Sequence, residues 1–202
     1  MDFLTSYTQL RQVCAVIDAQ GFAYGSANDK SSFVPVELSV VGNKQAHHIL
    51  YDLTLDSCMT GHQFTTYLHQ SRKIHGIRIK TSSTGNVVEI QKKLRDDILA
   101  LYEKHKTAVK TRFAVHNSNL VPILSELGIP IVNLSTPYAV VPRLNELDDK
   151  YGNANVCSVH TYERPHLRCS QRKALHYLMW LNEAISSVPT SAAPSRERCV
   201  SV

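Results

Sequence analysis

The sequence predicts an α/β domain in which helices flank a mixed five-stranded sheet. Three strand-like runs open the chain with short connections between them, and helices alternate with strands after residue 86. The 202 residues suit one domain with a sizeable core. We therefore expect a single domain over residues 1–186. The remaining segment, 187–202, is rich in Ser, Pro and Ala and is expected to be a disordered tail.

The first three strands are expected over residues 12–22, 31–42 and 46–55. The first is a Val/Ile run, the second alternates apolar and polar residues, and the third follows a short turn-like segment. Short connections favour an antiparallel meander. Residues 56–86 give a mixed signal, with a short strand or turn at 73–80 and a loop at 81–86.

The second half begins with a helix over residues 87–105, where apolar residues recur every three to four positions and form one face. A strand over 108–115, a helix over 117–129 that stops at Gly128 and a short strand over 130–135 follow. A short helix after Pro137 and a last helix over 170–186 complete the order. This element order is that of the ribonuclease H-like exonuclease fold, although order alone does not set function.

The composition is that of a globular intracellular protein with a mild preference for anionic partners. Apolar residues make up 43% and charged residues 19%; the net charge is +5 and the isoelectric point about 9.0. No apolar run suits a transmembrane helix, and the first residues lack a signal-peptide pattern. We therefore expect a reducing cytoplasmic or nuclear location, where clustered cysteines bind metal or react as thiols.

The acidic residues of a two-metal nuclease are mostly missing. Such enzymes hold two divalent ions with clustered carboxylates, and the first strand of the exonuclease pattern ends Asp-x-Glu. Here Asp18 is followed two residues later by Gln20. The pair His116-Asn117 is present, but residues 118–121 contain no acid, and the last helix begins with "SQRKALH". We expect no two-metal exonuclease activity, and we interpret Asp18 as a residue that caps or forms a local salt bridge.

The stretch "CSVHTYERPHLRC" over residues 157–169 suggests a zinc site. Cys157, His160 and Cys169 are three donors, and a tetrahedral site needs a fourth. One alternative is His166. The other is Glu37, which lies in an apolar strand where a charge is costly unless it is paired or coordinated.

These residues resemble the Maelstrom domain. Glu37 within "FVPVELSVV", followed far downstream by Cys-x2-His-x8-Cys and an apolar helix, is similar to its Glu-Cys-His-Cys zinc pattern. That domain is ribonuclease H-like, has lost the exonuclease carboxylates and is known from germline transposon silencing. Over residues 11–186 the resemblance implies such a domain or a diverged relative, with Glu37 as the fourth ligand. Four protein ligands leave no open position, so the zinc is expected to be structural and to hold the last helix on the sheet.

Three functions are consistent with the sequence. The first is binding of single-stranded RNA in small-RNA or transposon silencing, because basic residues lie among aromatic ones. The expected nucleic-acid-binding residues are Arg72, Lys73, Arg78, Lys110, Arg112, Arg164, Arg168, Arg172 and Lys173. The second is metal-independent RNA cleavage, for which the weak catalytic candidates are His116, His75, His176 and Asp18. The third is a protein-interaction scaffold with no nucleic-acid role. The resemblance also implies protein partners in a silencing complex.

Overall fold

The computed structural model describes residues 8–23, 33–57, 60–69, 71, 76–77, 79–135, 141–152 and 169–187. Its main sheet has the strand order β3-β2-β1-β6-β7. β1 (Val13–Ala23) pairs antiparallel with β2 (Phe33–Gly42), and β2 pairs antiparallel with β3 (Ala46–Leu50). β1 is parallel to β6 (Arg112–Val115), which is parallel to β7 (Ile131–Asn133). The predicted mixed five-stranded sheet with antiparallel leading strands is confirmed.

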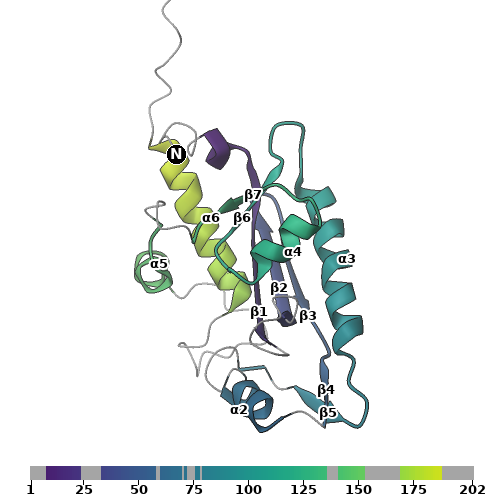
Figure 1. Ribbon diagram of the computed structural model, residues 1–202. Helices are drawn as coiled ribbons and strands as arrows, with labels where there is room; N and C mark the ends of the chain where they lie inside the picture. The colour runs from purple at the N-terminus through teal and green to yellow at the C-terminus, as the bar shows by residue number, and fades with distance from the viewer. Residues whose placement is uncertain are drawn as a thin grey trace, which may run out of the picture.

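Helices cover both faces of this sheet (Figure 1). α3 (Val87–His105) packs on β2 from one side, and α6 (Ser170–Ser186) packs on β1 and β2 from the other. α5 (Leu144–Tyr151) lies against α6. The strands β1 and β2 are therefore covered on both sides, which explains why every residue of β2 is buried.

Alternation along the strands divides the core into two parts. On the α3 side, Val36 and Leu38 of β2 pack with Ile98 of α3. On the α6 side, Val16 of β1 packs with Leu181 of α6. The apolar face expected for residues 87–105 is confirmed, because α3 buries Ile90, Leu94, Ile98 and Leu101.

The third predicted strand, 46–55, is wrong in its extent. It breaks into β3 and a short β4 (Thr54–Asp56), which pairs parallel with β5 (Lys80–Ser82) in a separate two-stranded sheet. The side chain of Asn86 binds the backbone between β3 and β4. Its Oδ1 accepts from the Thr54 N–H at 2.8 Å, and its Nδ2 donates to the Asp52 carbonyl at 3.0 Å. The spacing of apolar residues cannot predict a contact between residues more than thirty positions apart. α2 (Gly61–His69), in the segment of mixed signal, was also not predicted.

The later elements have the predicted type and order, but β6 covers only the second half of the predicted strand 108–115, and β7 is shorter than the predicted 130–135. α4 (Leu120–Glu126) begins after a turn in which the Asn117 Oδ1 accepts from the Asn119 N–H at 3.0 Å. It ends before Gly128, whose φ of 68° is the left-handed conformation that favours glycine. The last helix has the predicted bounds. Over the described residues, every helix is too short or too polar to cross a membrane.

Candidate functional site

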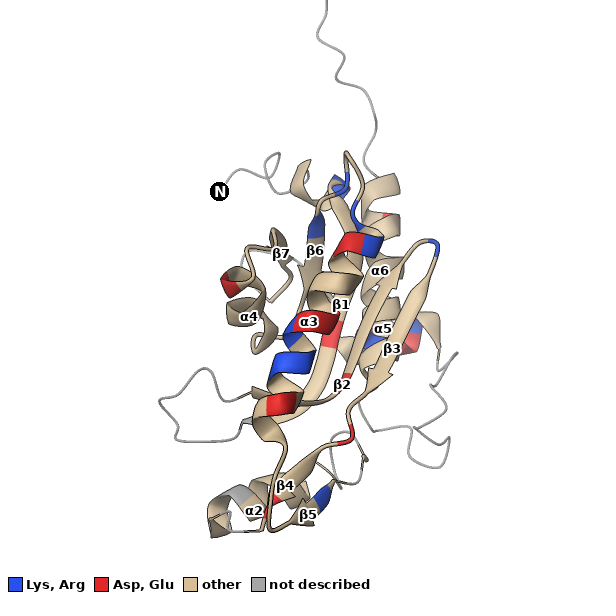
Figure 2. Ribbon diagram, turned by 90° about the vertical axis from the view of Figure 1, so that its right-hand side faces the viewer, with Lys and Arg blue, Asp and Glu red and all other residues tan. Residues whose placement is uncertain are grey.

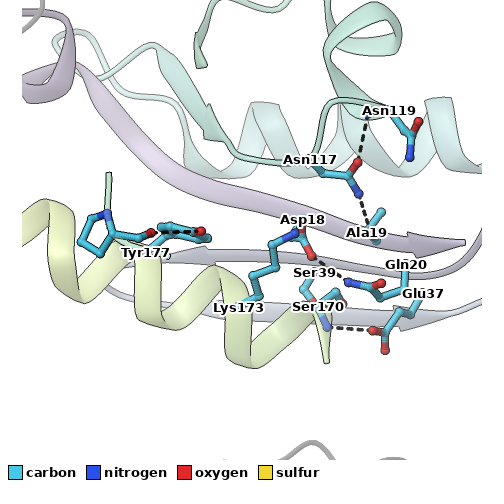
Figure 3. A network of polar contacts seen from close by, with 11 residues as sticks. Asp18, Ala19, Gln20, Glu37, Ser39, Asn117, Asn119, Ser170, Lys173 and Tyr177 are labelled. Carbon is cyan, nitrogen blue, oxygen red and sulfur yellow. Dashed lines mark hydrogen bonds and ion pairs between the residues drawn. The ribbon is translucent and has the colours of Figure 1, made fainter. Parts of the chain in front are cut away.

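The face of β1 and β2 that packs on α6 becomes polar toward the carboxyl end of β1 (Figure 3). In the strand register, Asp18 lies opposite Ser39, and Gln20 lies opposite Glu37. All four side chains are buried. Because side chains alternate along a strand, these residues share one face and meet the first turns of α6. A buried polar cluster therefore lies between the sheet and the last helix.

Asp18 is paired with a lysine from α6. The Lys173 Nζ lies 2.9 Å from the Asp18 Oδ1, with side chains 12% and 2% exposed. Gln20 donates from its Nε2 to the other carboxylate oxygen at 3.3 Å. Burial raises the pKa of Asp18, and the Lys173 ammonium opposes that rise. The expected salt bridge of Asp18 is present, but its partner lies 155 residues away rather than nearby in sequence.

Glu37 is fully buried and doubly hydrogen-bonded. Its Oε1 accepts from the Ser170 N–H at 2.7 Å, and its Oε2 lies 3.0 Å from the His48 Nε2. The hydroxyls of Ser39 and Ser170 are 2.7 Å apart beside it. The carboxylate therefore binds the first turn of α6 directly, where the helix dipole favours negative charge. His48 was not anticipated, because only the register of β3 on β2 brings it near Glu37.

Of the predicted zinc ligands, Glu37 and Cys169 lie within the described residues, and Ser170 connects them. Cys169, buried at 2% exposure, is the residue before α6 and directly precedes Ser170, whose N–H binds Glu37. Cys157, His160 and His166 lie outside the described residues. Within the described part of the chain, no group of three or more His, Cys, Asp and Glu side chains is placed to hold a metal ion.

A cleft of about 760 Å³ opens beside the polar cluster, at the carboxyl ends of β1 and β6. Ligands of open α/β sheets commonly bind at this end of the strands. Gln20 and Lys173 line the cleft, whereas Asp18 and Glu37 do not. The side chains of Asp18 and Glu37 are therefore not part of the cleft wall, whereas Lys173, which pairs with Asp18, is. The remaining lining residues are Ala19, Gly21, Phe33, His116, Asn117, Ser118, Asn119, Val141, Pro142, Arg143, Leu144, Asn145, Asp148, Arg172 and Tyr177.

Basic side chains outnumber acidic ones in this lining. Arg172 Nη2 lies 3.3 Å from Asp148 Oδ2, and the His176 Nδ1 lies 3.0 Å from the other oxygen of that carboxylate. Burial lowers the pKa of His176 despite the nearby Asp148. Arg143 is exposed at the start of α5, and among the described residues its guanidinium forms no ion pair. Arg143, which no sequence motif indicated, therefore adds an exposed guanidinium to the lining, and the Glu146 carboxylate accepts a hydrogen bond from the Arg143 backbone N–H at 2.8 Å.

Two aromatic residues of the lining, His116 and Tyr177, stack on each other. The rings of His116 and Tyr177 are 4.7 Å apart between centroids, with an interplanar angle of 16°. Next to them, Asn117 donates from its Nδ2 to the Ala19 carbonyl at 2.6 Å and so ties the loop after β6 to β1. The weak catalytic candidate His116 thus lines the cleft, whereas His176 is buried at 1% exposure.

The structure separates the predicted nucleic-acid-binding residues. Arg172 and Lys173 line the cleft, but Lys110 and Arg112 lie at the start of β6, at the opposite end of the strand. Arg112 is bound within the fold, donating to Gln12 Oε1 at 2.9 Å. Figure 2 shows both charge signs along α3, so this helix forms no uniformly basic face. His75, Arg72, Lys73, Arg78, Arg164 and Arg168 lie outside the described residues.

No family model, curated protein or solved structure matches this chain.

Proposed function

We propose that this chain is a catalytically degenerate ribonuclease H-like domain, similar to the Maelstrom domain, that binds single-stranded RNA without divalent ions. The observation that carries the proposal is the ion pair of 2.9 Å between Lys173 and the buried Asp18. Two divalent ions need several carboxylates, and a nearby ammonium repels them. Lys173 neutralises the carboxylate that remains, so this position offers divalent ions no net negative charge.

The cleft suits a flexible anionic strand. Arg143 supplies an exposed positive charge for phosphates, whereas Arg172 and Lys173 line the cleft in ion pairs with Asp148 and Asp18. His116 is the half-buried aromatic residue of the lining. Proteins that bind single strands without sequence preference combine these two features. We propose that the biological setting is small-RNA or transposon silencing, with further protein partners.

The test is fluorescence anisotropy with a labelled oligouridine of about twelve nucleotides, within the usual range of site sizes. Binding is expected to persist in EDTA and to weaken steeply as salt increases. Arg143→Gln should weaken binding several-fold and reduce the salt slope by about one, the effect of losing one phosphate contact. The matched control is Arg95→Gln, since Arg95 of α3 pairs with Glu126 outside the cleft. Binding that requires magnesium, or equal effects of the two variants, would contradict the proposal.

A structural zinc ion is part of the proposal, with Cys157, His160, Cys169 and Glu37 as ligands. Both oxygens of Glu37 already accept hydrogen bonds, but each carboxylate oxygen has a second lone pair, so ligation is compatible with these contacts. A zinc ion would join the segment before α6 to β2. The hydrogen bond from Ser170 to Glu37 makes the same connection with the chain's own atoms.

A second candidate function is metal-independent RNA cleavage, favoured by the position of His116 in the basic cleft. His116 would accept the proton of a 2′-hydroxyl as the 2′-oxygen attacks the adjacent phosphorus. The 5′-oxygen would leave with a proton from water, which gives a 2′,3′-cyclic phosphate and a 5′-hydroxyl. Cleavage in EDTA that both His116→Ala and His116→Phe abolish would support this function, and cleavage that survives either change would exclude His116 as the base.

A further inference from the structure

The side-chain amide of Gln20 has a fixed orientation beside the cleft. Its Nε2 donates to the Asp18 Oδ2 at 3.3 Å, and Lys173 binds the other oxygen of that carboxylate at 2.9 Å. A carboxylate oxygen accepts from an N–H and not from an amide oxygen, so this contact decides which atom of the amide faces Asp18. Figure 3 shows the nitrogen of Gln20 toward Asp18 and its oxygen away from that carboxylate. The amide oxygen, Oε1, is therefore an acceptor directed away from the ion pair.

This acceptor lacks a donor from the protein. Within the described part of the chain no group donates to the Gln20 Oε1, although the residue is only 8% exposed. Glu37, opposite Gln20 in the strand register, itself accepts from the Ser170 N–H, and the Asn117 Nδ2 donates to the Ala19 carbonyl instead. A ligand that displaces water from this part of the cleft must donate to the Oε1 or leave a buried acceptor unsatisfied.

The residues next to Gln20 leave the cleft wall low at this point. Gln20 lines the cleft together with its neighbours Ala19 and Gly21, which add at most a methyl group. The strand register shifts between Gln20 and Gly21, and a Cβ atom at Gly21 would lie 2.1 Å from the Val34 carbonyl oxygen. Position 21 therefore excludes a side chain, and the amide of Gln20 is the polar side chain that β1 contributes to the cleft.

We propose that the Gln20 Oε1 accepts a hydrogen bond from a ribose 2′-hydroxyl of the bound strand, so that the cleft prefers RNA to DNA. This inference rests on the proposed function. The phosphate and sugar-ring oxygens of a single strand are acceptors only, whereas the 2′-hydroxyl is a donor that RNA has in every nucleotide and DNA lacks. The same cleft contains the exposed guanidinium of Arg143, which attracts the phosphates of either strand. Gln20 therefore adds selectivity to an attraction that does not itself distinguish RNA from DNA.

The experiment compares oligouridine with oligodeoxyuridine of the same length, by anisotropy in EDTA at low salt. These strands have the same bases and phosphates and differ in the 2′-hydroxyls. The wild-type domain should bind the ribose strand about fivefold more tightly, the usual effect of one neutral hydrogen bond. Gln20→Met keeps a side chain of similar length without the acceptor, so it should weaken ribose-strand binding about fivefold and leave the deoxyribose strand within about twofold. The matched control is Gln45→Met, at an exposed glutamine outside the cleft, which should leave both affinities unchanged.

A third ligand keeps the inference testable if Gln20→Met does not fold. Oligouridine with 2′-fluorine retains a ribose-like sugar conformation but has no 2′ donor, so the wild-type domain should bind it about as weakly as the deoxyribose strand. Equal wild-type affinity for the ribose and 2′-fluoro strands, or an unchanged preference in Gln20→Met, would overturn the inference and leave strand binding in place. Equal losses for both strands in that variant would also overturn it, because they would assign the Oε1 to a base. If the wild-type domain binds neither strand at low salt, the proposed function fails as well.

Discussion

The substitution Lys173→Met tests whether the buried ion pair is essential to the fold. Methionine retains an apolar stem of similar length but removes the ammonium that lies 2.9 Å from Asp18. Breaking a buried pair by removing one partner typically costs about 3–5 kcal/mol, because an uncompensated charge remains. Asp18 is 1% exposed, so the carboxylate has no access to solvent that would relieve this cost.

The structure also sets an upper limit on this cost. Asp18 avoids a buried charge by taking up a proton, and its ordinary pKa is 3.8. Protonating Asp18 costs about 1.36 kcal/mol for each unit by which the pH exceeds that pKa. The free energy of unfolding lost at pH 7 is therefore at most about 4 kcal/mol. Since Lys173 is 12% exposed, we expect about 3 kcal/mol.

The pH dependence of stability shows whether the charge of Asp18 causes the loss in Lys173→Met. A carboxyl group whose pKa is raised in the folded state binds a proton that the unfolded chain releases. Burial already raises the pKa of Asp18 in the wild type, and removal of Lys173 should raise it further. The variant should therefore be nearly as stable as the wild type near pH 4 and should fall further below it as the pH rises. The double variant Asp18→Asn with Lys173→Met removes both charges and should recover most of the loss without this pH dependence.

Urea denaturation between pH 4 and 7.5 measures these differences, with the fluorescence of Trp180, the single tryptophan, reporting on α6. A variant within about 0.5 kcal/mol of wild type at pH 7, the size of an ordinary surface effect, would refute the reasoning. A loss that does not change with pH would assign the effect to packing rather than to the charge of Asp18.

Three further predictions concern the rest of the molecule. Burial and the neighbouring His47 lower the pKa of His105 below 6.5. Because the unfolded chain then binds a proton more readily than the folded one, the free energy of unfolding should decrease as the pH falls below 6.5. His105→Phe should reduce that decrease in urea titrations, and an unchanged slope would contradict the assignment. Purified protein should contain one zinc per chain, and Cys169→Ser should lose it; metal analysis giving less than about 0.2 equivalents with reduced thiols would exclude the site. The domain should show no 3′–5′ exonuclease activity on RNA or DNA with magnesium or manganese, because the Asp18 carboxylate is paired with Lys173 and cannot bind two divalent ions. A ladder of progressively shortened products would contradict this prediction.

The spacing of apolar residues was enough to predict the helices that bury one continuous face. The apolar face of α3 and the bounds of α6 follow from side-chain spacing alone, because a helix that packs along one face must repeat every three to four residues. The antiparallel start of the sheet followed from the short connections between its strands. The break after β3 did not, since it depends on the distant side chain of Asn86.

The sequence by itself showed Gln20 two residues after Asp18 and a basic start to the last helix, positions at which a two-metal exonuclease of the expected fold would carry acids. It also directed attention to Glu37 as a charge that needs a partner within an apolar strand. Only the tertiary structure decided what those partners are. Lys173 meets Asp18, and Ser170 and His48 meet Glu37, because α6 and β3 pack against residues far away in the chain. Charge pairing across such separations depends on the register of strands and the placement of helices, which local sequence patterns do not encode.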